Sequence, residues 1–324
     1  MKLTTALAAA GLSLAAFLSA SPAMALNTRS FVSPTGNDAN ACTLPAPCRT
    51  FQIAFNQTIA GGEIDVLGSA GYGALTIDKA ISIVNPGGYV ASMFVAAGGV
   101  GITVNAPADA AVNLQGLTID GGGAGYNGIV FNSGASLTVD NCVVKNFHNI
   151  GDAATGHGIY IAPTSGTLKF AITNTTASNN GYGGVSMFMP IGGSANITGV
   201  IDHLVATANQ FYGIVSDSHS SGAETVAIAN SITSNAYSGI FSGNYGSGTM
   251  KVSIDNVTAS GNQRGIEADG TAKVFLGRST IMGNTEFGTY NSTSPNTFYT
   301  FQNNQVYLNA TDVGGTAPTP VTFH

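Results

Sequence analysis

A glycine followed by a β-branched residue recurs at nearly constant intervals, and this repetition limits the folds open to the chain more than any other feature. The repeat is clear from about Leu114 onwards. Its copies are Gly128-Ile129, Gly158-Ile159, Gly184-Val185, Gly213-Ile214, Gly239-Ile240, Gly265-Ile266 and Gly288-Thr289, at steps of 30, 26, 29, 26, 26 and 23 residues. A period of about 20 to 50 residues is typical of solenoids, in which each copy buries its apolar face against its neighbours.

A second short strand with alternating apolar residues lies about fifteen residues before most of these glycines. Its copies are Leu137-Thr138-Val139, Phe170-Ala171-Ile172, Val226-Ala227-Ile228, Val252-Ser253-Ile254 and Val274-Phe275-Leu276. An Asn-rich turn then follows as Asn141 with Asn146, Asn174 with Asn179, Asn230 with Asn235, Asn256 with Asn262, His203 with Asn209 and Arg278 with Asn284. Asn tolerates left-handed backbone angles, and stacked Asn side chains can bond one another as a ladder.

The unit of strand, Asn turn and strand predicts one coil of a parallel β-helix. Strand-like segments begin upstream at Glu63, so we expect the β-helix to cover 63–313 in about ten coils spaced about 4.8 Å apart. An antiparallel sandwich or barrel is the alternative for short alternating strands. The alternative is disfavoured because hairpins do not require a common period of about 26 residues.

The first 25 residues have the pattern of a secretory signal peptide. Lys2 precedes an apolar run of about fifteen residues, and small residues end the segment at Ala25. We expect cleavage near Ala25 and a secreted or periplasmic protein. The apolar run is too short to span a bilayer as a helix, so no transmembrane segment is expected.

Residues 26–62 are predicted to form an N-terminal cap, and 314–324 a tail. A solenoid needs covered ends because open sheet edges promote aggregation. In the cap, Thr50–Ile59 is expected to form a short helix with Thr50 at its N-cap and Phe51, Phe55 and Ile59 on one face.

Three cysteines lie outside the signal segment. Cys42 and Cys48 flank a loop of five residues, so they can form a disulfide in an oxidising compartment. Cys142 is expected to be a small buried apolar residue rather than a reactive thiol.

The low charge content and the excess of acidic residues argue against nucleic acid as a partner. Only 8% of the residues are Asp, Glu, Lys or Arg, against about 25% in an ordinary soluble domain. Ten basic residues against sixteen acidic ones leave no basic surface for nucleic acid. We expect a monomer without a required cofactor, apart from a candidate Ca²⁺ site described below.

The chain resembles the exported right-handed β-helix repeat proteins of bacteria, within the pectate-lyase-like superfamily. The resemblance rests on Phe31–Asp38, Cys42, Cys48–Phe51 and Gly61–Leu67, followed by the Gly-Ile coils. It implies an all-β fold, a single-stranded right-handed parallel β-helix with a short N-terminal capping helix. Activity does not follow, because the superfamily includes lyases, hydrolases, epimerases, adhesins and members without a known activity.

Gly156-His157-Gly158 is similar to a Gly-His-Gly segment of polygalacturonases, which implies a catalytic role for His157. The acidic residues and the Arg-Ile-Lys segment that complete that family's pattern are missing here. The favoured interpretation of His157 is therefore a histidine at a coil corner.

Charged residues form a second candidate site. If each repeat Ile points inward, alternation places Glu267 and Asp269 on the outward face, in line with Asp217 two coils away, and Arg264 begins the same strand. Such a group could bind Ca²⁺ through Asp217, Glu267 and Asp269, or provide catalysis through Arg264 and Glu267. The alternative is a solvated charged patch without a function.

An aromatic column precedes the repeat glycines, and it predicts carbohydrate binding. Tyr rings repeated at the strand spacing could stack on the C–H faces of sugars, while the alternative is an internal aromatic stack that fills the coil corner. The candidate residues are Tyr126, Tyr182, Phe211, Tyr212 and Tyr237.

Two hypotheses for function follow. In the first, an exported β-helix binds an extended polymer, a polysaccharide or cell-surface glycan, along its long face as a binding or structural surface protein. In the second, it is a polysaccharide lyase or glycoside hydrolase that acts on an acidic polysaccharide. The missing catalytic pattern favours the first.

Overall fold

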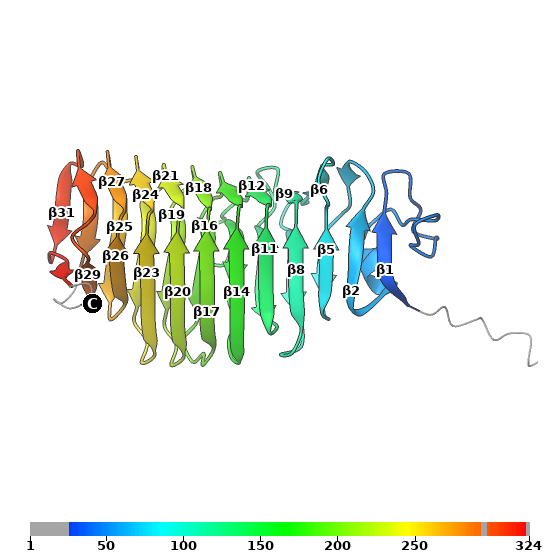
Figure 1. Cartoon of the computed structure of the whole chain (residues 1–324), viewed down its shortest axis with the longest axis horizontal. Helices are drawn as coiled ribbons and strands as arrows, with labels where there is room; N and C mark the ends of the chain where they lie inside the picture. Colours follow the sequence, from blue (N-terminus) through cyan, green and yellow to red (C-terminus); the bar gives the residue numbers. More distant parts are fainter. Residues whose placement is uncertain (1–25, 293–296, 322–324) are drawn as a thin grey trace, which may run out of the picture.

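The structure, a computed structural model, describes residues 26–292 and 297–321. The chain winds into a rod of stacked coils, and each coil adds one strand to each of three parallel sheets (Figure 1). Sheets II and III have ten strands each, and sheet I has twelve. The predicted all-β parallel β-helix of about ten coils is confirmed.

Sheet I forms one long side of the rod. Its alternating residues point into the core and to the surface, as in the burial pattern of β14. Its strands, in order, are β1 (Asn27–Val32), β2 (Thr58–Val66), β5 (Ile81–Val84), β8 (Ala111–Gln115), β11 (Ser136–Asp140), β14 (Thr167–Thr173), β17 (Asn196–Asp202), β20 (Ala223–Ala229), β23 (Thr249–Asp255), β26 (Lys273–Gly277), β29 (Phe298–Thr300) and β32 (Thr319–Pro320).

Sheet II consists of short strands within the segments that were predicted as Asn turns. In β15, two left-handed residues, Asn174 (φ 50°) and Asn179 (φ 54°), lie on either side of the strand. The strands are β3 (Ala70–Gly71), β6 (Ala91–Phe94), β9 (Leu117–Asp120), β12 (Val143–Lys145), β15 (Thr176–Ser178), β18 (Val205–Thr207), β21 (Ile232–Ser234), β24 (Thr258–Ser260), β27 (Thr280–Met282) and β30 (Gln305–Tyr307). Each coil therefore has three strands rather than two.

Sheet III contains the repeat glycines and most of the candidate site residues. Its strands are β4 (Leu75–Ile77), β7 (Val100–Asn105), β10 (Asn127–Ser133), β13 (His157–Ile161), β16 (Gly183–Met189), β19 (Tyr212–Ser218), β22 (Ser238–Asn244), β25 (Arg264–Gly270), β28 (Phe287–Asn291) and β31 (Thr311–Gly315). The core between the three sheets is filled mainly by Ile, Val, Leu, Met and Ala side chains.

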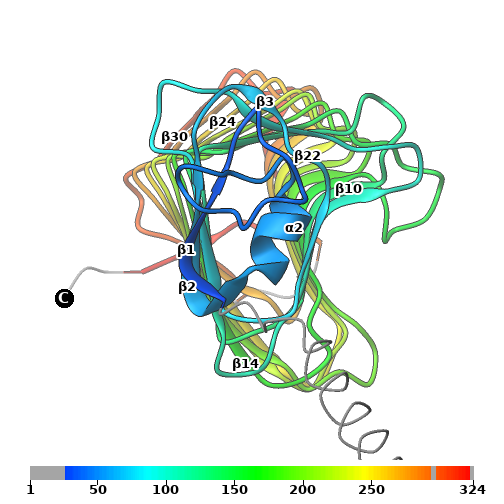
Figure 2. The same cartoon turned by 90° about the vertical axis from the view of Figure 1, so that its right-hand side faces the viewer.

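The N-terminal region contains the predicted disulfide and a helix that is shorter than predicted. Cys42 and Cys48 are bonded, and Cys142 is free and buried. Helix α2 (Phe51–Asn56) lies within the outline of the coils when the rod is seen from its N-terminal end (Figure 2). Ile59 was predicted on the helical face, but it belongs to β2, because the chain turns into sheet I directly after α2.

Two further details differ from the sequence analysis. Thr50 occupies the N-cap position without a side-chain cap, and its hydroxyl instead donates to Asp38 Oδ2 at 3.0 Å. At the other end, β31 and β32 extend parallel pairing into the segment 314–324 that was predicted as a tail. The signal peptide predicted for 1–25 lies outside the described residues. Among the described helices, none is long and apolar enough to cross a membrane.

Among the residues that the structure describes, Glu224 on β20 is a fully buried carboxyl group. Its register neighbours on the adjacent strands are Ile197 and Met250, so it occupies an inward position where apolar residues are otherwise found. The Ser216 hydroxyl donates to Oε1, while Oε2 has no hydrogen-bond partner. Burial raises the pKa of Glu224 from 4.5 to about 7, and the Ser216 bond offsets only part of this rise. The folded chain therefore favours the protonated carboxyl.

The raised pKa of Glu224 predicts how the free energy of unfolding depends on pH. Between pH 4.5 and about 7 the folded chain holds a proton that the unfolded chain has released. The free energy of unfolding should therefore fall as the pH rises through this window, by about 3 kcal/mol from this group alone. In Glu224→Gln this contribution is expected to be absent. Urea denaturation at a series of pH values, wild type against variant, measures the difference.

An exposed carboxyl provides the control for this measurement. Asp109→Asn, which removes a carboxyl group on an exposed turn, is measured alongside it. The comparison between variants is needed because His157 acts in the opposite direction: its pKa is lowered to about 4, so stability is lost as the pH falls below 6.5. If Glu224→Gln and the wild type lose stability in parallel, Glu224 does not release a proton in this window.

Candidate functional site

The outward face of sheet III gathers the candidate residues, as the predicted alternation requires. Ile159, Val185, Ile214, Ile240 and Ile266 all point inward and are completely buried. The outward residues between them form two columns along the rod. The first contains Tyr160, Ser186, Val215, Phe241, Glu267 and Tyr290, and the second contains Phe188, Asp217, Gly243 and Asp269.

An aromatic row runs along this face. The ring centroids of Tyr182 lie 5.4 Å from Phe211 and 5.5 Å from Tyr212, and Tyr212 lies 5.4 Å from Phe241. Phe211 is 39% exposed, and Tyr182 and Tyr212 are half-buried. Phe241 is buried, with 9% exposure. The rings lie on the outward face of sheet III, in mutual contact across neighbouring coils, and Phe211 is the most exposed of them.

The two remaining aromatic candidates lie apart from this row. Tyr126 is separated from Tyr182 by Gly156, whose backbone bonds both residues but which has no side chain to continue the stack. Tyr237 lies instead under the guanidinium of Arg264, at 5.3 Å from its ring centroid. The aromatic row thus unites three of the five predicted residues and adds Phe241.

His157 is held in place on both sides of its ring. Nδ1 lies 2.7 Å from Ser186 Oγ, and Nε2 lies 2.8 Å from the carbonyl oxygen of Ala153. The carbonyl can only accept, so Nε2 carries the proton and Nδ1 accepts from the serine. Burial lowers the pKa of His157 to about 4. A neutral histidine with both nitrogens occupied orients the loop before β13, and its catalytic role stays a prediction.

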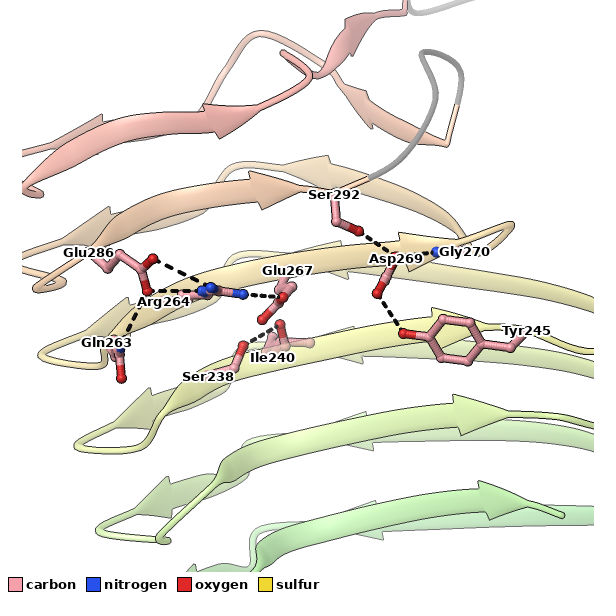
Figure 3. A network of polar contacts seen from close by, with 10 residues as sticks. All are labelled: Ser238, Ile240, Tyr245, Gln263, Arg264, Glu267, Asp269, Gly270, Glu286 and Ser292. Carbon is pink, nitrogen blue, oxygen red and sulfur yellow. Dashed lines mark hydrogen bonds and ion pairs between the residues drawn. The ribbon is translucent and has the colours of Figure 1, made fainter.

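Arg264 is the centre of an ion-pair and aromatic network (Figure 3). Its Nη1 donates to Glu267 Oε1 at 2.6 Å, and its Nε donates to Glu286 Oε2 at 3.1 Å. The guanidinium also lies 4.4 Å from the ring centroid of Tyr290. Burial alone would lower the pKa of Arg264, but the two carboxylates outweigh this and raise it. Arg264 is therefore a fixed cation and cannot serve as a base in this arrangement.

Glu267 is a nearly buried carboxyl group on this face. Its side chain is only 6% exposed. Oε1 accepts from Arg264. Oε2 is buried, and the nearby Ser238 hydroxyl, which lies 3.3 Å from the carbonyl oxygen of Ile240, lowers the pKa of Glu267 slightly. Burial raises the pKa of Glu267 against the lowering effect of Arg264. Such a group can donate a proton or a hydrogen bond to a ligand.

A second acidic group lies beside it. Asp269 accepts from Tyr245 Oη at 2.6 Å and from the Ser292 hydroxyl (Figure 3). Burial would raise the pKa of Asp269, but these hydrogen bonds lower it. Asp217 has the opposite balance, because burial and the charge of Asp269 raise its pKa more than His219 lowers it. His219 Nε2 lies 3.2 Å from Asp217 Oδ1 and is the group that lowers the pKa of Asp217.

His219 and Tyr245 were missed by the sequence analysis, although the alternation could have found them. Both follow the second outward column by two positions, after Asp217 and Gly243, where the strands end. Their rings stack with centroids 5.0 Å apart. Extending the period of two by one step beyond each strand would have placed them on the same face.

The three carboxylates predicted to bind Ca²⁺ share this face. The part of the chain that the structure describes contains no group of three or more His, Cys, Asp and Glu residues close enough to hold a metal ion. A Ca²⁺ site requires six to eight oxygen ligands at about 2.3–2.6 Å. Binding of Ca²⁺ by Asp217, Glu267 and Asp269 stays a prediction.

No protein-family model and no curated protein matches the chain. Among solved structures, it is similar to the pectate lyase Pel9A, with a TM-score of 0.58 and 17% identity over 93% of this chain and 78% of that one. The A-module of the Azotobacter vinelandii mannuronan C-5 epimerase AlgE6 gives a TM-score of 0.42 at 14% identity, over 81% and 88% of the two chains. A rhamnogalacturonan lyase gives 0.38 at 12% identity, over 88% of each chain.

The likeness to the pectate lyase Pel9A shows the fold of the protein. The chain is a parallel β-helix protein of the pectate-lyase-like fold, as the resemblance in its sequence implied. At 17% identity the likeness to the pectate lyase Pel9A concerns the fold, because fold alone does not determine function.

Proposed function

We propose that the protein binds an extended polysaccharide along the outward face of sheet III, as a binding or structural surface protein. The observation that carries the proposal is the aromatic row, in which rings from successive coils touch at the surface. Sugar rings present apolar C–H faces that pack on aromatic faces, and an extended polymer can contact several coils at once. The pectate-lyase-like fold supports a polysaccharide as the polymer.

A specific observation supports catalysis as the second candidate. Glu267 combines a raised pKa with a free buried oxygen, which suits a general acid. Arg264 and His157, the other catalytic candidates, have their donors or ring nitrogens occupied by protein groups. A lyase or hydrolase would therefore depend on Glu267 with one of the neighbouring aspartates. Binding remains the favoured function because the rings of the aromatic row lie in contact across successive coils, whereas Arg264 and His157 are occupied by protein groups.

An exported location agrees with two features. The Cys42–Cys48 disulfide is the kind of bond that persists in oxidising compartments. The N-terminal segment has the signal-peptide pattern described above. A glycan outside the cytoplasm is then the expected partner.

Removing rings from the aromatic row is expected to weaken polysaccharide binding. Tyr182→Ala and Phe211→Ala should each reduce affinity about fivefold, the equivalent of about 1 kcal/mol of ring stacking. The matched control is Phe275→Ala, because Phe275 stacks on Tyr299 on the outward side of sheet I. Retention on immobilised polysaccharides and titration calorimetry measure the change, and circular dichroism verifies folding.

The same incubations test the second candidate. Release of reducing ends or unsaturated products that stops in Glu267→Gln would make the protein an enzyme. If Phe275→Ala weakens binding as much as Phe211→Ala, or if no polysaccharide is retained, the proposed binding face is wrong.

A further inference from the structure

The connection between sheets II and III is much longer before β13 than before the strands that follow. It comprises residues 146–156, whereas 179–182, 208–211 and 235–237 make the same connection before β16, β19 and β22. The aromatic row lies on these short connections and on the strands that begin after them. The long connection, called the insertion below, therefore lies directly before Tyr182, the first ring of the row.

Hydrogen bonds to the preceding coil hold the insertion in a fixed position. At its start, the backbone N–H of His148 donates to the carbonyl oxygen of Gly125 at 2.7 Å. Near its end, Asn127 Nδ2 donates to the carbonyl oxygen of Ala154 at 2.9 Å. Because the insertion is bonded at two points, it is a fixed part of the surface.

The insertion reaches over the outward face of sheet III. Tyr160 is an outward residue of β13, yet it is buried, and its ring stacks on that of His157 at 4.2 Å. His157 in turn bonds the carbonyl oxygen of Ala153 in the insertion. Ala153 also lines a hollow in the face together with Ser186 of β16 and Val215 of β19. The insertion therefore stands beside the outward residues of the coils that follow it.

The accessible part of the aromatic row ends at Tyr182. The ring centroid of His157 lies 4.7 Å from that of Tyr182, so ring contacts continue beneath the insertion. His157 and Tyr160 are both buried, however, and cannot offer a ring to a sugar. A polymer that rests on Phe211 and Tyr182 therefore meets the insertion where the accessible rings end.

The row has no such obstacle in the other direction. Beyond Phe241, the connections between sheets II and III are residues 261–263 before β25 and 283–286 before β28, as short as those that carry the row. The face is thus closed on the side of β13 and open on the side of β28. Only the terminal unit of a polymer can lie against the closed side.

We propose that the insertion 146–156 makes the protein bind the end of a polysaccharide chain, with the terminal sugar on Tyr182 and the rest of the chain extending along the row towards Phe241. This inference rests on the proposed function, because it concerns a chain bound to the aromatic row. The selection is steric: a chain that continued past Tyr182 would overlap Ala153. An obstacle of this kind rejects internal segments without adding affinity for the end.

A series of chain lengths tests chain-end binding with the wild-type protein. The probes are size-fractionated galacturonan, mannuronan and a neutral glucan, all long enough to cover the row and compared at equal sugar concentration. A tenfold longer chain then presents fewer ends, so the amount of protein bound should fall about tenfold, with one protein per chain at every length. Sedimentation of the complexes measures both quantities.

A shortened connection tests whether the insertion is the obstacle. Replacing residues 148–155 by one glycine leaves a turn as long as 179–182 and keeps Phe147 and Gly156. Binding at equal sugar concentration should then no longer depend on chain length, and several proteins should bind one long chain. Ile150→Ser changes an exposed side chain of the insertion without shortening it, so this control should behave as the wild type. Circular dichroism verifies folding.

A spin label provides a measurement without a deletion. Ile150→Cys can be labelled selectively, because Cys142 is buried and Cys42 is bonded to Cys48. The label should broaden the NMR signals of a terminal sugar in a bound oligomer more than those of the internal sugars. The control label, at Ile232→Cys on sheet II, should broaden neither selectively.

The contrary results distinguish this inference from the proposed function. Wild-type binding that is independent of chain length but weakened by Phe211→Ala would overturn chain-end binding and keep the binding face. Chain-end binding that persists in the shortened variant, or selective broadening of internal sugars by the label at position 150, would overturn the role of the insertion. If the shortened variant does not fold, the spin label decides. Retention of none of the probes would overturn both proposals.

Discussion

Replacing Gly239 by alanine is expected to destabilise the protein by about 3 kcal/mol, although alanine is otherwise favoured over glycine in a strand. A Cβ atom at Gly239 would lie 2.6 Å from the carbonyl oxygen of Gly265 in the next coil, and 2.7 Å from Thr233 Oγ1. The first contact is with backbone, which can move only if the coils separate. Urea denaturation followed by circular dichroism measures the loss.

Gly71→Ala provides the matched control for this substitution. Gly71 also lies in a strand, but a Cβ atom there would meet its nearest neighbour at 3.7 Å, an ordinary contact distance. Its stability should change by less than about 0.5 kcal/mol. If Gly239→Ala is equally well tolerated, the close packing of successive coils does not explain the glycine repeat.

The repeat glycine shows how much of the fold the sequence could reveal. Its period predicted coils, and the alternation around it predicted which residues point outward. The reason for the glycine lies in the neighbouring coil, since the obstructing oxygen belongs to the next repeat glycine. Gly239 has no positive φ that would have required a glycine for its own conformation. A contact between coils cannot be recognised within one copy of the repeat.

Predicted Asn residues bond one another at the surface, where Asn179 donates to Asn146 and Asn256 to Asn230, each at 2.7 Å, but a second ladder was placed in the wrong register. The sequence analysis aligned Asn179 and Asn235 with Asn209 and Asn284. In the structure, Asn179 and Asn235 are left-handed turn residues at the surface, with φ of 54° and 56°. The buried ladder lies one residue later, where Asn180 donates to Asn209 at 2.9 Å and Asn284 to Asn309 at 2.7 Å. Both roles favour Asn, so composition alone could not separate them.

The candidate site was predicted in its position but not in its burial. Glu267 was placed on the outward face, and the alternative was a solvated patch. The structure makes Glu267 outward and yet 94% buried, from its 6% side-chain exposure, because Phe241 and Tyr290 on the adjacent strands and Arg264 on the same strand cover it. Burial on an outward face depends on the size of side chains from neighbouring coils, which alternation within one strand does not describe.

Removal of Arg264 is the second substitution with a large expected effect. In Arg264→Ala the buried carboxylate of Glu267 loses its partner, and the rings of Tyr237 and Tyr290 lose the guanidinium between them. Breaking a buried pair in this way costs about 3–5 kcal/mol, which we reduce to about 2–3 kcal/mol because the Arg264 side chain is 18% exposed. Denaturation in urea at neutral pH measures the loss.

The pH dependence distinguishes the lost ion pair from lost packing. Burial already raises the pKa of Glu267, and without Arg264 the pKa should rise further. An acid whose folded pKa is raised stabilises the fold in its protonated form, so stability is lost as the pH rises from the unfolded towards the folded pKa. Arg264→Ala should therefore be less destabilised in acid than at neutral pH. A loss that is equal at both pH values would indicate packing alone.

A double substitution tests whether Arg264 and Glu267 depend on each other for stability. Glu267→Gln removes the charge that Arg264→Ala leaves unpaired, so the double variant should be more stable at neutral pH than Arg264→Ala alone. Arg278→Ala provides the comparison, because Arg278 pairs with Asp255 at the surface with its side chain 67% exposed, and little change is expected there. If the effects of Arg264→Ala and Glu267→Gln simply add, the two side chains do not depend on each other. The pKa of Glu267 would then be set by its burial rather than by Arg264.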